Sequence, residues 1–164
     1  MILKKQHGAS AVEFAVILPF LITLVFGIIE FGLLLYNQQV LTNASREGAR
    51  AAIIGKCAGG SETVIVRKTD AEIRQIVTDY CIDPDDTTKK RLITFNTSNI
   101  APATTVVPSP SDCTPNPGGS GLTVGDDVTV TVTYNYTFLL PTILGFGPTK
   151  LLTARTVMKM ESAP

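Results

Sequence analysis

Two carboxylates stand at places where the sequence is otherwise apolar. Glu13 lies directly before a run of mostly apolar residues at 14–36, and Glu30 lies inside that run. A carboxylate in hydrocarbon costs roughly 2.5 to 3.5 kcal/mol even on the mildest scale, so each needs a polar partner or a route to water. The chemistry that these two residues can do is therefore electrostatic pairing.

Each carboxylate also has a simple explanation that involves no other molecule. Glu13 lies within two turns of Lys4 and Lys5, so its side chain can reach the inner surface of a membrane. Glu30 is only about two turns from Tyr36, so it can reach the outer interface; alternatively, it pairs with another subunit. The sequence leaves both alternatives open for Glu30.

Three cysteines, Cys57, Cys81 and Cys113, follow the apolar run. In an oxidising compartment they can form a disulfide, and we favour Cys57 with Cys81, although Cys113 could partner either. The only histidine, His7, lies before the run, so a zinc site or a Cys/His nucleophile is not expected.

The spacing of the other polar residues does not indicate catalysis. There is no glycine-rich phosphate loop, and Asp126 and Asp127 are adjacent turn residues without a catalytic spacing. Lys+Arg and Asp+Glu balance at 14 each, with no basic stripe, which argues against binding of nucleic acid. We expect a protein that is not an enzyme and uses no metal or other cofactor.

The run at 14–36 is long enough to cross a lipid bilayer, because a spanning helix needs about 20 mostly apolar residues. Pro19 lacks a backbone N–H, so we expect a kink that Thr23 or a neighbouring helix relieves. Lys4 and Lys5 keep the N-terminus in the cytoplasm by the positive-inside rule. The sequence thus predicts a single-pass protein of the cytoplasmic (inner) membrane whose C-terminal part is extracytoplasmic.

Beyond the apolar run the helix should continue as a stem and end near Gly55. Residues 9–55 would then form one transmembrane and stem helix, about 65 to 70 Å long. Leu41, Ala44, Gly48 and Ala51 recur at spacings of three and four and form a seam of small residues. The seam suits another helix or the chain's own domain, and both remain open.

Residues 56–164 are expected to form a small exported α+β domain. Thr69 and Glu72 have the spacing of a capping box, which predicts a second helix over 70–80. Strict alternation predicts a strand over 126–138, with one face on the domain.

The remaining elements of this domain are less regular. Residues 153–161 alternate again and can return as the antiparallel partner of that strand, while 91–95 is a candidate first strand. Residues 102–121 are rich in Pro, Ser, Thr and Gly, which predicts a long exposed loop. The apolar residues 139–148 should cover the core or contact another subunit or the membrane. The fold class is therefore α+β, with a small C-terminal antiparallel sheet against the stem helix.

The residues around Gly8 carry a more specific pattern. A cut after Gly8 would make Ala9 the first residue and Glu13 the fifth. With the basic leader at 1–8 and the apolar helix that follows, this resembles the class III signal of type IV prepilins. The resemblance implies cleavage by a prepilin peptidase. In a bundle, Glu13 could then meet the new terminal ammonium of a neighbour and fix the register, since slippage leaves both charges unpaired.

A narrower resemblance covers about the first third of the chain. The resemblance lies in segments 13–15, 18–19, 29–32 and 41–52. The last of these contains an Arg-Glu-Gly-Ala-Arg block followed by two alanines. This part of the chain resembles the TadE-like family of minor pilins and pseudopilins of tight-adherence (Tad, Flp-type, type IVb) pilus systems. An alanine at the first mature position is typical of this family. The resemblance implies other pilin subunits, the membrane assembly platform and the prepilin peptidase as partners.

The function that the sequence favours is thus structural. We expect a minor pilin or pseudopilin that takes part in assembly of a Tad pilus used for adhesion, secretion or DNA uptake. The alternative is an uncleaved, membrane-anchored binding or sensing module, whose outer domain captures a ligand while the helix only tethers it.

Overall fold

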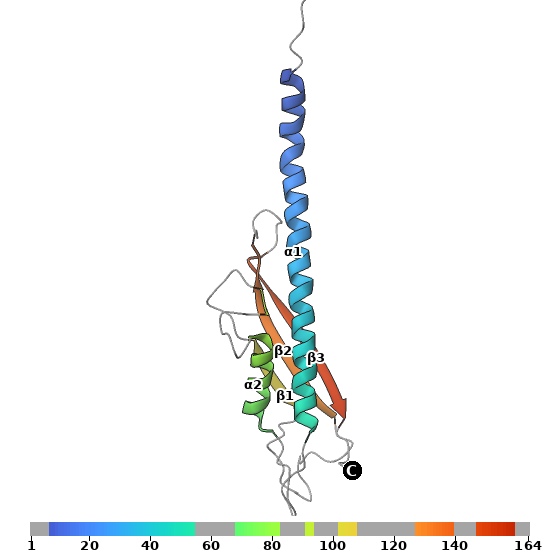
Figure 1. The fold of residues 1–164 in the computed structure, drawn as a ribbon, viewed down its shortest axis with the longest axis vertical. Coiled ribbons are helices and arrows are strands. Elements are labelled where there is room, and N and C mark those ends of the chain that lie inside the picture. Colours follow the sequence, from blue (N-terminus) through green and yellow to red (C-terminus); the bar gives the residue numbers. More distant parts are fainter. Residues whose placement is uncertain are drawn as a thin grey trace, which may run out of the picture.

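One helix carries almost the whole first third of the chain. The computed structural model describes residues 7–54, 68–82, 91–93, 102–107, 127–139 and 147–159. Helix α1 runs from His7 to Ile53, 47 residues, and is about 70 Å long at 1.5 Å per residue. Its N-terminal half projects alone, whereas its C-terminal half lies along the second helix and the sheet (Figure 1). The predicted α+β fold is confirmed.

α1 continues through Pro19 without interruption. The hydroxyl of Thr23 donates a hydrogen bond of 2.8 Å to the carbonyl of Pro19 itself, four residues earlier. The sequence had suggested that Thr23 could replace the N–H that proline lacks, and in the structure it does not. It makes the local back-bond that threonine commonly forms inside helices.

Helix α2 covers Asp70–Cys81 and begins at the predicted capping box. The N–H of Glu72 donates to the Thr69 hydroxyl at 3.3 Å, and the N–H of Thr69 donates to the Glu72 carboxylate at 2.7 Å. Ile73, Val77 and Cys81 recur every fourth residue and are buried, so α2 presents one apolar face to the core.

The sheet has three antiparallel strands in the order β1-β2-β3. β1 is Ala103–Val107, β2 is Asp127–Thr137 and β3 is Thr149–Lys159. β2 is central because it pairs with both neighbours. The alternation predicted for β2 is observed, since every second side chain from Val128 to Tyr136 is buried.

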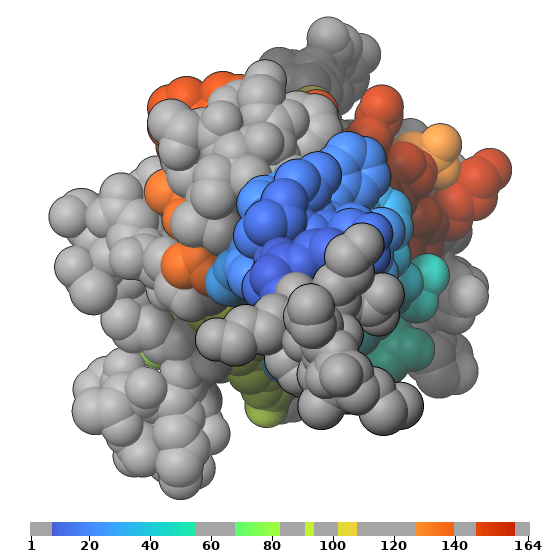
Figure 2. Space-filling view, turned by 90° about the horizontal axis from the view of Figure 1, so that it is seen from above, coloured from blue at the N-terminus to red at the C-terminus, as the bar shows by residue number. Residues whose placement is uncertain are grey.

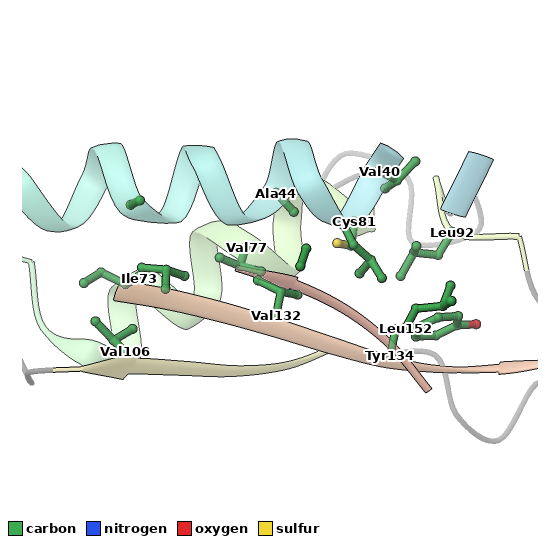
Figure 3. Packing of buried hydrophobic residues seen from close by; sticks show 14 of the residues in the cluster. Val40, Ala44, Ile73, Val77, Cys81, Leu92, Val106, Val132, Tyr134 and Leu152 are labelled. Atoms are coloured by element: carbon green, nitrogen blue, oxygen red, sulfur yellow. The ribbon is translucent and has the colours of Figure 1, made fainter. Parts of the chain in front are cut away.

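Both helices pack on this buried face of the sheet. In Figure 3, Ala44 of α1, Val77 of α2 and Val132 of β2 occupy the layer between helices and strands, with Val106 of β1 at its edge. The opposite face is lined by the threonines of β2 and carries the exposed Val157 of β3. The core therefore lies between the sheet and the C-terminal half of α1.

Two predictions about the first strand are wrong. β1 lies inside 102–121, which its composition had marked as a loop, and its Thr104 and Val106 are buried. Residues 91–93 are not in a strand; the N–H of Arg91 instead donates to the carbonyl of Cys81 at 2.9 Å. Residues 91–93 are therefore held by the end of α2, and by α1 through the N–H of Ile93, which donates to Asn37. They are not paired with the sheet.

Other boundaries differ less. β3 begins at Thr149, earlier than the predicted 153, because its first residues pair with the end of β2 although they do not alternate in burial. Residues 140–146 of the predicted apolar loop lie outside the described residues, as do Gly55 and the leader residues 1–6.

Candidate functional site

We call residues 8–29 of α1 the arm. None of them is buried, and the arm lies in the helix that, among the described residues, is long and apolar enough to cross a membrane. At 1.5 Å per residue the arm is about 33 Å long, close to the roughly 30 Å of a bilayer's hydrocarbon core. The arm therefore matches the membrane in both length and polarity.

Glu13 is exposed near the start of the arm. Its side chain makes no hydrogen bond or ion pair within the described part of the chain. Gly8 and Ala9 are exposed as well, and a side chain at Gly8 would meet nothing within 4 Å. Lys4 and Lys5 lie outside the described residues. Gly8 and Ala9, which flank the bond of interest, lie in the first turn of α1 and are covered by no other described part of the chain.

Glu30 marks the point at which α1 meets the outer domain, and it is only 4% exposed. The hydroxyl of Tyr136 donates to its carboxylate at 2.6 Å, and the N–H of Leu139 donates to both carboxylate oxygens at 3.1 and 3.2 Å. We call Glu30, Tyr136 and Leu139 the joint. Neither alternative from the sequence contained this arrangement, because the partners lie more than a hundred residues away on β2 and just beyond it.

The joint keeps Tyr136 protonated. Burial raises the pKa of the Tyr136 hydroxyl, and the hydrogen bond to Glu30 raises it further. Phe138 packs edge-on against the Tyr136 ring, with centroids 5.4 Å apart at 86°. The ring is thus held in place, so its hydroxyl remains a donor aimed at the carboxylate.

Asn37 fixes the next contact, two turns further along α1. This residue is fully buried; its amide nitrogen donates to the carbonyl of Ile93 at 2.7 Å, and its oxygen accepts from the N–H of Ile93 at 2.9 Å. One side chain therefore satisfies both backbone groups of Ile93, much as a neighbouring strand would. Sequence reasoning missed Asn37, since a single polar residue after an apolar run gives no signal of its partner.

Two more polar side chains of α1 contact β3. Gln38 donates to the carbonyl of Thr153 at 3.0 Å, and the hydroxyls of Ser45 and Thr156 lie 2.7 Å apart. Hydrogen bonds are directional, so these contacts allow one rotation and one height of α1 relative to the sheet. The C-terminal half of α1 is thereby set in register with the domain.

The predicted seam serves this same contact. Leu41, Ala44, Gly48 and Ala51 are all buried in their own chain. A Cβ at Gly48 would lie 2.6 Å from Val77 Cγ2, so the helices approach more closely than any larger residue permits. Of the two alternatives, the structure places the seam against its own domain.

Cys81 is a free thiol, fully buried in the core. Burial raises its pKa to about 12, although nearby Arg91 opposes the shift. A free Cys81 counts against the predicted disulfide with Cys57; Cys57 and Cys113 themselves lie outside the described residues. Within the described ranges, no three His, Cys, Asp or Glu side chains are placed to hold a metal ion.

Comparison with known proteins gives a match to a family model. The model of the family described as TadE-like protein matches residues 8–50, which hold the arm and most of the packed half of α1. No curated protein and no solved structure matches the chain. The resemblance predicted from the sequence is confirmed for residues 8–50, which are similar to the TadE-like family, and with the apolar helix this match fits a membrane protein associated with a Tad pilus.

Proposed function

We propose that this chain is a minor pilin or pseudopilin of a Tad pilus. In this proposal the arm spans the cytoplasmic membrane with its N-terminus inside, a prepilin peptidase cuts after Gly8, and the subunit enters the filament or its base through α1. Its function is packing, and the outer domain is carried on the stem outside the membrane.

The observation that carries the proposal is that the exposed apolar arm contains a carboxylate, that of Glu13, without a partner among the described residues. The exposed Glu13 finds no partner in the described part of its own chain, whereas the buried Glu30, Asn37 and Ser45 of α1 each have one. In a bundle of such arms the ammonium of Ala9, freed by the cut, could supply that partner. The TadE-like match begins at Gly8, the residue that would precede the cut, which supports this site.

The first experiment sequences the amino terminus of the membrane-extracted protein from cells that assemble the pilus. We expect the mature chain to begin at Ala9. A chain with an intact leader would overturn the proposal and would favour the uncleaved anchored module.

The second experiment asks whether Glu13 works in the filament. Glu13→Ala should be inserted and cut normally but should be absent from sheared filaments, because the neighbour's ammonium is left unpaired in a low-dielectric bundle. Glu47→Ala, which removes an exposed carboxylate from the packed half of α1, is the matched control and should be incorporated normally. Incorporation of both variants at the wild-type level would remove the register role of Glu13.

A further inference from the structure

The joint determines how far the outer domain stands from a membrane that the arm spans. The arm is about as long as the hydrocarbon core is thick, and Glu30 directly follows it. Because Tyr136 and Leu139 both donate to the Glu30 carboxylate, the end of β2 is tied to the same depth. The β2 and β3 ends at the joint must then lie at the outer surface of that bilayer.

The side chains at this end suit an interface between lipid and water. Leu139 remains 38% exposed although its N–H is bound to Glu30. Lys150 is exposed on β3 directly opposite Tyr136, and Phe31, which follows Glu30 on α1, is 62% exposed. Apolar side chains beside a cation are the combination that binds at the boundary of acyl chains and headgroups.

The ends of β2 and β3 at the joint also lie beside α1, at the height where the arm ends. Viewed along α1 from its N-terminal end, parts of β2 and β3, in orange and red, lie beside the blue arm (Figure 2). In Figure 1 the ends of β2 and β3 reach the middle of α1, where the projecting half begins. The surface of a membrane that surrounds the arm would therefore lie next to these strand ends.

We propose that residues 138–139 and 147–150 form a second membrane contact, in which Leu139 enters the lipid interface and the ammonium of Lys150 lies among the lipid phosphates. Residues 140–146 lie outside the described residues and are not part of this site. The proposal rests on the membrane-spanning role of the arm. With two contacts the stem and the domain packed on it cannot tilt or rotate freely relative to the membrane, so the stem stands at a fixed angle on the membrane until the subunit leaves the lipid.

The test uses the absence of tryptophan from the chain. Full-length Leu139→Trp is reconstituted in vesicles of phosphatidylcholine and phosphatidylglycerol, with part of the phosphatidylcholine brominated close to the headgroup. We expect blue-shifted emission, quenching by the brominated lipid and protection from aqueous acrylamide. Val157→Trp, on the outer face of β3 at the far end of the sheet, should show none of these effects.

A second site guards against a local change of fold. Lys150→Trp replaces an exposed residue on the other strand and should be quenched by the same lipid. If brominated lipid quenches the emission of neither Leu139→Trp nor Lys150→Trp, the contact does not exist. If both variants are protected from acrylamide but not quenched by lipid, protein and not lipid covers the site, and the proposal is equally wrong.

One further variant separates this proposal from the one on which it rests. Leu21→Trp in the middle of the arm should be quenched by lipid brominated deep in the acyl chain. If Leu21→Trp is quenched and Leu139→Trp is not, the arm spans the membrane and only the second contact fails. If Leu21→Trp is not quenched either, both proposals fail.

Discussion

The two halves of α1 belong to one uninterrupted helix but have opposite surroundings. In the arm no side chain is buried, and apolar residues such as Phe20 and Leu24 are 81% and 52% exposed. In the half from Glu30 to Ile53, small and polar residues are buried against α2 and the sheet. A helix that is apolar all round has no preferred rotation, whereas one with polar side chains bound to fixed partners has a single rotation. The arm is therefore suited to lipid and to other apolar helices alike, while the packed half stays in place.

The largest effect should come from the same truncation made in each half. Leu41→Ala removes a fully buried side chain and should lower the free energy of unfolding by about 2 to 5 kcal/mol, through lost burial and the cavity left behind. Leu24→Ala, in the arm, should leave it unchanged. Urea unfolding in mild detergent, followed by amide exchange in β2, measures both variants. Equal losses in the two would show that the halves are not energetically distinct.

The joint gives the second prediction. Tyr136→Phe deletes one donor to Glu30 and should cost about 1.5 to 3 kcal/mol, since a buried carboxylate loses a hydrogen bond. Tyr36→Phe removes an exposed hydroxyl and should stay within about 0.5 kcal/mol of wild type. A cost for Tyr136→Phe no larger than that of Tyr36→Phe would contradict the joint.

The pH dependence of stability tests the same hydrogen bond. Because the pKa of Tyr136 is raised in the folded state, its contribution is full below the ordinary value of 10.0 and is lost as the pH rises above it. The wild type should therefore lose more stability above pH 10.0 than Tyr136→Phe does. Parallel alkaline profiles of the two proteins would rule out a perturbed Tyr136.

Close packing gives the third prediction. Gly48→Ala places a Cβ 2.6 Å from Val77 Cγ2 and 3.3 Å from Val130 Cγ1, and should cost about 1 to 3 kcal/mol. Gly32→Ala meets nothing within 4 Å and should be neutral or stabilising by up to about 1 kcal/mol, because alanine favours helix. Thermal unfolding of both variants checks the sign. A Gly48→Ala variant as stable as Gly32→Ala would mean that the helices can separate without cost.

Patterns within a single element were readable from the sequence. The apolar run predicted α1, the spacing of Thr69 and Glu72 predicted α2, and alternation predicted β2. Each of these signals is local, because it depends on residues one to four positions apart. Local signals were therefore enough for these three elements, for residues 153–159 of β3, which alternation had also predicted, and for the family resemblance.

The individual polar contacts between distant residues were not readable. The partners of Glu30 are far along the chain, and Asn37 takes the place of a strand beside Ile93. β1 was hidden because its few β-branched residues follow Pro102 in a segment whose composition is typical of loops. In each case the structure depends on a contact with a residue far away in the sequence, and neither periodicity nor composition predicts such a contact.

The smallest expected effect lies where the two helices begin. α1 has no acidic residue in its first turn, whereas α2 begins with Asp70, Glu72 and a capping box. Thr69→Ala should cost about 1 kcal/mol, since the N–H of Glu72 loses its acceptor. Circular dichroism and urea unfolding at neutral pH measure the loss, and an unchanged Thr69→Ala would show that α2 is held by its apolar face alone.

Low pH should weaken the same capping box of Thr69 and Glu72. Hydrogen bonds from the N–H and the hydroxyl of Thr69 lower the pKa of Glu72 below its usual 4.5. Its contribution to stability is therefore present above pH 4.5 and is lost as the pH falls through the lowered value. Glu72→Gln should lose less stability than the wild type over that acidic range. If it does not, the charge of the carboxylate plays no part in the cap, and the beginning of α2 depends on an acidic residue no more than that of α1, which has none in its first turn.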